Sequence, residues 1–232
     1  MNGLHAMAAW IQQETSARRP GLDQTGVVMR TASVLLLLLP GKNGPELLFE
    51  VRSGKLGWQP GDICFPGGRR ESSDRNYAAA AVREASEELG VPYKDIQLCG
   101  TLDFFAAHNG FMVYPFVGTW NPEKISETPD AVYRQWDYNR DEVAELFSVP
   151  LSWFLQHEPR IGTAHIQVTR KDDFPFELVP HLDPHKDFHQ EYPIYFYQYG
   201  DKVIWGMTAA ILHSFLERFG KGLARLCVRY FF

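Results

Sequence analysis

The stretch FPGGRRESSDRNYAAAAVREASEELGV, which spans Phe65–Val91, decides the fold of this chain. It opens with a Pro-Gly-Gly turn and continues into a segment whose small and apolar residues recur at helical spacing. Gly90 supplies a stop for this helix, and Pro92 follows it. The sequence therefore predicts a helix over Tyr77–Leu89 that is entered from a glycine-rich turn.

The other face of this helix collects acids. Because a helix advances by about 100° per residue, Glu84, Glu87 and Glu88 share one arc. Arg83 lies one turn before Glu87, so it can pair with that carboxylate and reduce repulsion among the acids. Oxygen ligands of this kind suit Mg²⁺ or Mn²⁺, which also bind substrate phosphates. An acidic cluster alone is more often a solvated helix face, so the surrounding motif decides between the two interpretations.

That motif reads G-x5-D-x8-R-E-x2-E-E-x-G, from Gly68 through Asp74 and Arg83 to Gly90. It resembles the Nudix box of enzymes that hydrolyse nucleoside diphosphates linked to another moiety. The usual box has Glu in place of Asp74, and its arginine comes one residue earlier. Both departures are similar to the pattern of the coenzyme A pyrophosphatase branch of the Nudix family.

The residues before the box resemble the signature of the same branch, in which an Arg-Ser pair, here Arg52 and Ser53, precedes FPGG. Two positions differ from that signature: Gly57 stands where it usually has Arg, and Glu50 where it usually has Thr. A cation that could contact the nucleotide's phosphates is therefore missing from position 57. Two later segments are also similar to the branch, NRDEVAELFSVPL (139–151) and WGMTAAIL (205–212).

The resemblance implies a Nudix α/β/α sandwich with a mixed sheet, in which the box forms a loop-helix-loop. It further implies Mg²⁺- or Mn²⁺-dependent hydrolysis of coenzyme A or acyl-coenzyme A to 3',5'-ADP and the phosphopantetheine. Hydrolysis of ADP-ribose or a nucleotide sugar is the alternative. Two other classes have less support: an isoprenyl diphosphate isomerase using Cys64, and a binding module without turnover, which would usually have lost the metal carboxylates.

The resemblance also assigns roles to individual residues. Glu84 and Glu88 are expected to be the principal metal ligands, with Glu87 as a further ligand and the Gly68 carbonyl as an additional one. Arg83 is expected to orient these carboxylates. The residues alone favour Asp74 as the helix N-cap rather than a ligand.

The base that activates water has three candidates in the sequence, Glu87, Glu142 and Glu145, of which we favour Glu142. Arg52 is the preferred phosphate-binding residue. Four aromatic residues could stack a nucleobase, although such side chains are more often part of the core; they are Trp58, Phe104, Phe105 and Phe111.

Hydrophobic periodicity and residue composition predict the other strands and helices. Strands are expected at 29–39, 47–52, 96–105, 112–119 and 161–170, and a last helix at 206–219. Residues 1–28 are predicted to be an N-terminal helical extension, 29–232 the Nudix domain, and 121–139 a long loop. The three histidines of HLDPHKDFHQE (181–191) have the spacing of a zinc helix, but Pro184 argues against a helix and favours a polar surface extension.

The composition limits the classes of partner. The 232 residues include 45% apolar residues and carry a net charge of −5, which fits one enzyme domain that binds a small molecule and no nucleic acid. The apolar run 34–39 is far shorter than the roughly 20 residues of a membrane span. Three cysteines favour a reducing compartment, so we expect a cytoplasmic protein. The sequence leaves open whether the chain forms a homodimer.

Overall fold

The computed structural model describes residues 30–42, 44–108, 110–120 and 132–231. The N-terminal helix expected over 1–28 lies outside these residues, as does most of the loop expected over 121–139. The described part of that loop contains a 3₁₀ turn, Val132–Gln135, whose first two side chains are buried. This end of the expected loop thus contains a short turn whose Val132 and Tyr133 pack into the core.

A mixed sheet of eight strands forms the body of the molecule. Strand β1 pairs with β7 in parallel, and the other pairs are antiparallel. The order β3-β2-β1-β7-β5 runs across the sheet, and β4, β6 and β8 pair with β1, β7 and β2 respectively. The strands are β1 (Arg30–Leu39), β2 (Glu46–Arg52), β3 (Ile63–Cys64), β4 (Gly67–Gly68), β5 (Ile96–Thr101), β6 (Phe105–Ala106), β7 (Phe111–Trp120) and β8 (Val143–Pro150).

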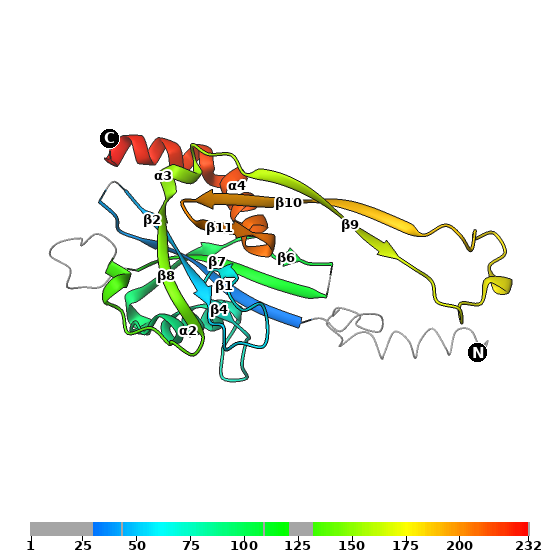
Figure 1. Cartoon of the computed structure of the whole chain (residues 1–232). Coiled ribbons are helices and arrows are strands. Elements are labelled where there is room, and N and C mark those ends of the chain that lie inside the picture. The colour runs from blue at the N-terminus through cyan, green and yellow to red at the C-terminus, as the bar shows by residue number, and fades with distance from the viewer. Residues whose placement is uncertain (1–29, 43, 109, 121–131, 232) are drawn as a thin grey trace, which may run out of the picture.

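Helices cover both faces of this sheet (Figure 1). Helix α2 has the predicted limits, Tyr77–Leu89, and buries its alanines against Leu35 and Leu37 of β1. Helix α4 (Gly206–Phe231) lies on the opposite face, where it packs with Leu36. Because side chains alternate along a strand, the leucine run of β1 supplies both halves of the core. The predicted sandwich with a mixed sheet is thereby confirmed.

A second sheet was only partly predicted. It contains β9 (Arg160–Val168), β10 (Phe188–Tyr199) and β11 (Lys202–Trp205), and the β9–β10 hairpin projects from the body (Figure 1). The strand expected over 161–170 corresponds to β9, whereas β10 and β11 were not predicted. Most of β10 is at least partly exposed, so it lacks the pattern of a core strand. The histidine-rich segment is not helical; it consists of turns followed by the start of β10.

Three other expectations need correction or extension. The strand expected over 96–105 is divided into β5 and β6, since the β5–β7 register shifts between Leu98 and Gly100 and β5 ends at Thr101. Helix α4 continues well past 219. The segment 139–151, which was noted only for its resemblance to the branch, contains β8 and leads at Pro150 into a short helix, α3 (Leu151–Phe154). Among the described residues, no helix is both long and apolar enough to cross a membrane.

Candidate active site

The glycine turn before α2 is fixed by close contact with β1. Gly67 has φ 152°, and a Cβ atom there would lie 2.2 Å from the Ser33 carbonyl oxygen. Val34 and Ser33 of β1 face Gly67 and Gly68 across a two-residue antiparallel pairing. Only glycine fits position 67, so the turn is held firmly against the sheet. It carries the Gly68 carbonyl to the edge of the acidic helix.

Arg83 is the centre of the ion pairs in the box. Its guanidinium donates to both carboxylate oxygens of Asp74 at 3.0 Å, and also to Glu84 and Glu87 at 2.9 Å. A fifth bond joins Arg83 Nη2 to the Arg69 carbonyl at 3.1 Å. These donations from Arg83 lower the pKa of Asp74. A bidentate pair of this kind fixes the guanidinium as well as the carboxylate.

Asp74 is not the N-cap, which corrects the sequence prediction. Asn76 caps α2 by accepting from the Ala79 N–H at 2.9 Å. The helix begins at Tyr77, so Asp74 lies too early to cap it. Its side chain is only 5% exposed and accepts from the Glu71 N–H as well as from Arg83. Asp74 therefore joins the loop to the helix.

Glu88 is the most deeply buried acid of α2, at 5% relative exposure. Its Oε2 accepts from the Gly67 N–H at 2.7 Å, which joins the helix to the turn. Burial raises its pKa well above the ordinary value, and the charge of Glu50 adds to the effect. Burial also raises the pKa of the partly buried Glu84. Both carboxylates would gain from a nearby cation.

Glu50 of β2 belongs to the same cluster, although sequence reasoning noted it only as a departure from the signature. It is 1% exposed, and its Oε2 has no hydrogen-bond partner. The Cys64 thiol donates to its other oxygen at 3.1 Å. Burial raises the pKa of Glu50 to about 8. The available signal was a charged residue inside the apolar run LLFEV.

The structure separates the candidates for the base. Glu142 is exposed, and its charge adds to the burial effects that raise the pKa values of Glu50, Glu84 and Glu88. Glu87 is also exposed but pairs with Arg83. Glu145 instead binds Lys202 of β11 at 2.6 Å. In the part of the chain that the structure describes, the carboxylate of Glu145 is therefore engaged in an ion pair, unlike that of Glu142.

A cavity of about 730 Å³ adjoins the glycine turn. Its wall includes the predicted phosphate-binding residue Arg52, whose Nε donates to the Trp58 carbonyl at 3.3 Å. Three of the four aromatic candidates also line it: Trp58, Phe105 and Phe111. The volume lies within the range of pockets that hold nucleotide-sized ligands.

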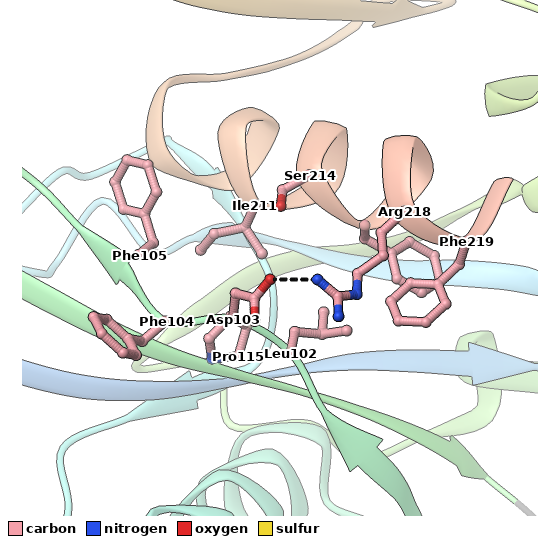
Figure 2. A pocket seen from close by; sticks show the side chains of 10 residues that line it. Leu102, Asp103, Phe104, Phe105, Pro115, Ile211, Ser214, Arg218 and Phe219 are labelled. Carbon is pink, nitrogen blue, oxygen red and sulfur yellow. Dashed lines mark hydrogen bonds and ion pairs between the residues drawn. The ribbon is translucent and has the colours of Figure 1, made fainter.

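Phe104 lies elsewhere, beside a smaller cavity of about 60 Å³ between the large sheet and α4 (Figure 2). There Arg218 pairs with Asp103 at 3.0 Å. Ile211 and Leu102 contribute apolar wall to the same hollow. This space is too small for a nucleotide, so the candidate site is the larger cavity together with the carboxylates.

The donor set of the cluster suits a hard divalent cation. It offers the carboxylates of α2 and the Glu50 Oε2, which has no hydrogen-bond partner among the described residues. A Cβ atom on Gly68 would lie 2.5 Å from Glu84 Cδ, so the turn and this carboxylate are in direct contact. Within the described residues, no three His, Cys, Asp or Glu side chains already form a complete metal site. Arg83 accounts for this, because it draws Glu84 and Glu87 toward itself.

Comparison with known families decides the identity of this arrangement. Residues 29–171 match the model of the NUDIX domain. The chain belongs to the Nudix hydrolase family. It is 32% identical to a protein named uncharacterized Nudix hydrolase NudL from Photorhabdus laumondii, over 82% of this chain and 84% of the relative.

A second relative agrees with this membership. A protein of the same name from Citrobacter koseri is 31% identical over 87% of this chain and 89% of its own length. The solved structure of a MutT/nudix family protein from Enterococcus faecalis is similar with a TM-score of 0.48 and 15% identity, covering 93% of this chain and 70% of that one. The chain is thus a Nudix pyrophosphohydrolase, as the box had indicated.

Replacing Asp74 with Asn tests the ion-pair centre. The Asp74→Asn variant loses the charge that holds Arg83, so we expect diphosphate hydrolysis to fall by about 10- to 100-fold, as for other residues that orient metal ligands. Asp141→Asn is the control, because Asp141 also pairs with a cation, Lys55, at 2.6 Å but on the exposed surface. Equal rates for Asp74→Asn and the wild type would contradict the orienting role.

Glu50 predicts a pH dependence of stability in the metal-free protein. Folded Glu50 keeps its proton up to about pH 8, whereas the unfolded chain loses it near the ordinary value of 4.5. The folded state therefore binds more protons in this window, and the free energy of unfolding falls as the pH rises through it. Glu50→Gln removes this loss, so we expect a gain of about 1–3 kcal/mol above pH 8.

Thermal unfolding in EDTA at about pH 5 and about pH 9 measures this difference. The melting temperature of Glu50→Gln should exceed that of the wild type mainly at the higher pH. Glu177→Gln, an exposed substitution of the same kind, should show no such trend. An advantage for Glu50→Gln that does not change with pH would show that burial of the charge is not its cause.

Proposed function

We propose that this protein hydrolyses the diphosphate bond of coenzyme A or an acyl-coenzyme A, giving 3',5'-ADP and the phosphopantetheine. The large cavity beside the carboxylates carries the proposal. Its wall combines arginines near the glycine turn with an apolar region from Ile194, Tyr195 and Met207. A nucleotide joined to a long arm of aliphatic carbons and amides can use both parts. ADP-ribose, the alternative, is polar at both ends and makes less use of the apolar region.

Glu84 and Glu88 are our principal ligands for Mg²⁺ or Mn²⁺, with Glu87 and the Gly68 carbonyl as further ones. The cation would neutralise charge on the bridging oxygens and lower the pKa of a bound water. The Gly67 N–H fixes one oxygen of Glu88 and leaves the other for the metal. Glu84 and Glu87 would turn from Arg83 toward the cation, while Asp74 keeps Arg83 in place.

Arg52 would bind a phosphate of the substrate. It lines the cavity, and its Nε donates to a main-chain carbonyl, so the rest of the guanidinium can face an anion. Glu142 would accept the proton of the attacking water. Glu142 directly precedes β8, and its carbonyl accepts from the Ser53 N–H at 2.8 Å. Its charge contributes to the raised pKa values of Glu84 and Glu88.

The isomerase and the binding module without turnover have weaker support. An isomerase would need Cys64 as a proton donor. Its thiol lines the cavity but donates to Glu50, and burial raises its pKa. Membership of the Nudix hydrolases favours hydrolysis over this reaction. A binding module without turnover would have lost its metal carboxylates, and this chain retains Glu84, Glu87 and Glu88.

Glu88→Gln tests the metal ligands. The amide keeps the shape of the side chain and can still accept from the Gly67 N–H, so folding should be retained. One ligand charge disappears, and we expect turnover to fall about 100-fold or more, with weaker Mn²⁺ binding in calorimetry. Glu217→Gln, on the exposed surface of α4, is the control. Undiminished turnover in Glu88→Gln would remove this assignment.

Mass-resolved product analysis of the same variants identifies the substrate. Wild type and Glu88→Gln are incubated with Mg²⁺ and, separately, coenzyme A, acetyl-coenzyme A, ADP-ribose, nucleoside triphosphates or isopentenyl diphosphate. Phosphopantetheine from coenzyme A, absent with the variant, is the expected result. Cleavage of ADP-ribose or triphosphates alone would leave the hydrolase class intact and overturn the coenzyme A assignment.

Glu142→Gln tests the base. Without a proton acceptor, kcat should fall by about 10²- to 10⁴-fold, while Mn²⁺ affinity changes less than about twofold. Glu145→Gln is a matched control from the same strand region, since Glu145 pairs with Lys202. A normal kcat in Glu142→Gln would return the role to Glu87.

A further inference from the structure

Arg30 is an arginine of the cavity wall for which the hydrolytic site has no use. It begins β1, and its guanidinium carbon lies 5.9 Å from the ring centroid of Trp58. Among the described residues, no carboxylate pairs with this guanidinium. An arginine that stacks on an indole and keeps its N–H donors unpaired is arranged to receive an anion.

The sheet directs Arg30 into the cavity. Arg30, Ala32 and Val34 all line it, which is the alternation expected for one face of a strand. The small side chain of Ala32 leaves open space between Arg30 and the region of the glycine turn. Phe111 faces Arg30 in the parallel β1–β7 pairing and stacks on Trp58 with ring centroids 6.0 Å apart. The stacked pair of Trp58 and Phe111 therefore lies beside the Arg30 guanidinium.

The position of Arg30 along β1 separates it from the scissile bond. Ser33 faces Gly68, and Arg30 lies three residues earlier. At a rise of about 3.3 Å per residue, the two levels are about 10 Å apart. A phosphate held by the metal ligands beside Gly68 is therefore offset along β1 from the level of Arg30, whose guanidinium lies over Trp58. Arg30 would bind a different part of the substrate.

The charge of the wall favours an anionic group there. The described lining contains the arginines 30, 52 and 69 but one acid, Asp62. Arg30 also lies over the residue that follows Gly57, the position where the signature usually has Arg. A Cβ atom on Gly57 would meet nothing within 4 Å, so steric crowding does not explain the glycine. Arg30 brings a cation to this loop from the neighbouring strand.

We propose that Arg30, positioned by Trp58, binds a phosphate on the nucleoside part of the substrate that is separate from the scissile diphosphate. This inference deepens the proposed function and rests on it: in coenzyme A the group is the ribose 3'-phosphate. Dephospho-coenzyme A and ADP-ribose lack such a phosphate. Arg30 would thus make the site selective for 3'-phosphorylated nucleotides.

Calorimetric binding of adenosine 3',5'-bisphosphate and of AMP tests the inference without turnover. Arg30→Gln should weaken the bisphosphate about tenfold or more, the value of a charge-assisted bond, and AMP less than about twofold. Arg140→Gln is the matched control, since its guanidinium lies 4.6 Å from the Tyr138 ring but outside the lining of the cavity. Circular dichroism checks that each variant is folded.

Equal weakening of both nucleotides, weakening of neither, or no binding of the bisphosphate by the wild type would overturn the inference. In turnover, the ratio of kcat/KM for coenzyme A to that for dephospho-coenzyme A should fall about tenfold in Arg30→Gln, through KM. If neither compound is cleaved but Arg30→Gln still discriminates against the bisphosphate, the proposed function fails and the phosphate site stands. Cleavage of both compounds with an unchanged ratio would mean that the proposed function stands and the phosphate site at Arg30 fails.

Discussion

The ion pair between Arg83 and Asp74 is the constraint on which the site depends. Asp74 is buried and accepts two bonds from the guanidinium, so Arg83 cannot leave without exposing an unpaired charge to the interior. The remaining donors of Arg83 then reach Glu84, Glu87 and the Arg69 carbonyl. One side chain thereby sets the position of the acidic helix face relative to the loop that carries the glycines.

The second constraint is the burial of two acids that do not pair with Arg83. Glu88 and Glu50 lie together in the interior, and Arg83 contacts neither of them in the described structure. Their raised pKa values measure the cost of burying acids without a cation. The fold tolerates this cost because the β1 leucines, the alanines of α2 and the glycine turn pack closely around the cluster. Burial of this kind disfavours the charged form of both acids, so a cation bound beside them would stabilise their carboxylates.

Features that depend on residues close together in the sequence could be predicted, and features that depend on distant residues could not. The limits of α2 depend on local periodicity, an N-cap and Gly90, all of which are visible in one stretch. The role of Asp74 depends on Arg83, which lies nine residues away. Local capping rules instead favoured Asp74 as the N-cap of the helix, a position that Asn76 occupies. Glu50 acquires its environment from Cys64 and the acids of α2, which no spacing rule brings together. Strand β10 was missed because its exposed residues, with Pro193 among them, lack the apolar alternation of a core strand.

The altered spacing of the box has a physical explanation in these contacts. Compared with the usual pattern, one more residue lies between the acid and the arginine, and the acid is Asp. Because α2 begins at Tyr77 and continues unbroken to Leu89, the additional residue must be accommodated in the loop before Asn76. In this loop the Asp74 carboxylate lies two residues before the N-cap and accepts two bonds from Arg83 across the helix start. The acid of the altered spacing therefore still forms a bidentate pair with the arginine of the box, and its burial at 5% exposure makes that pair costly to break.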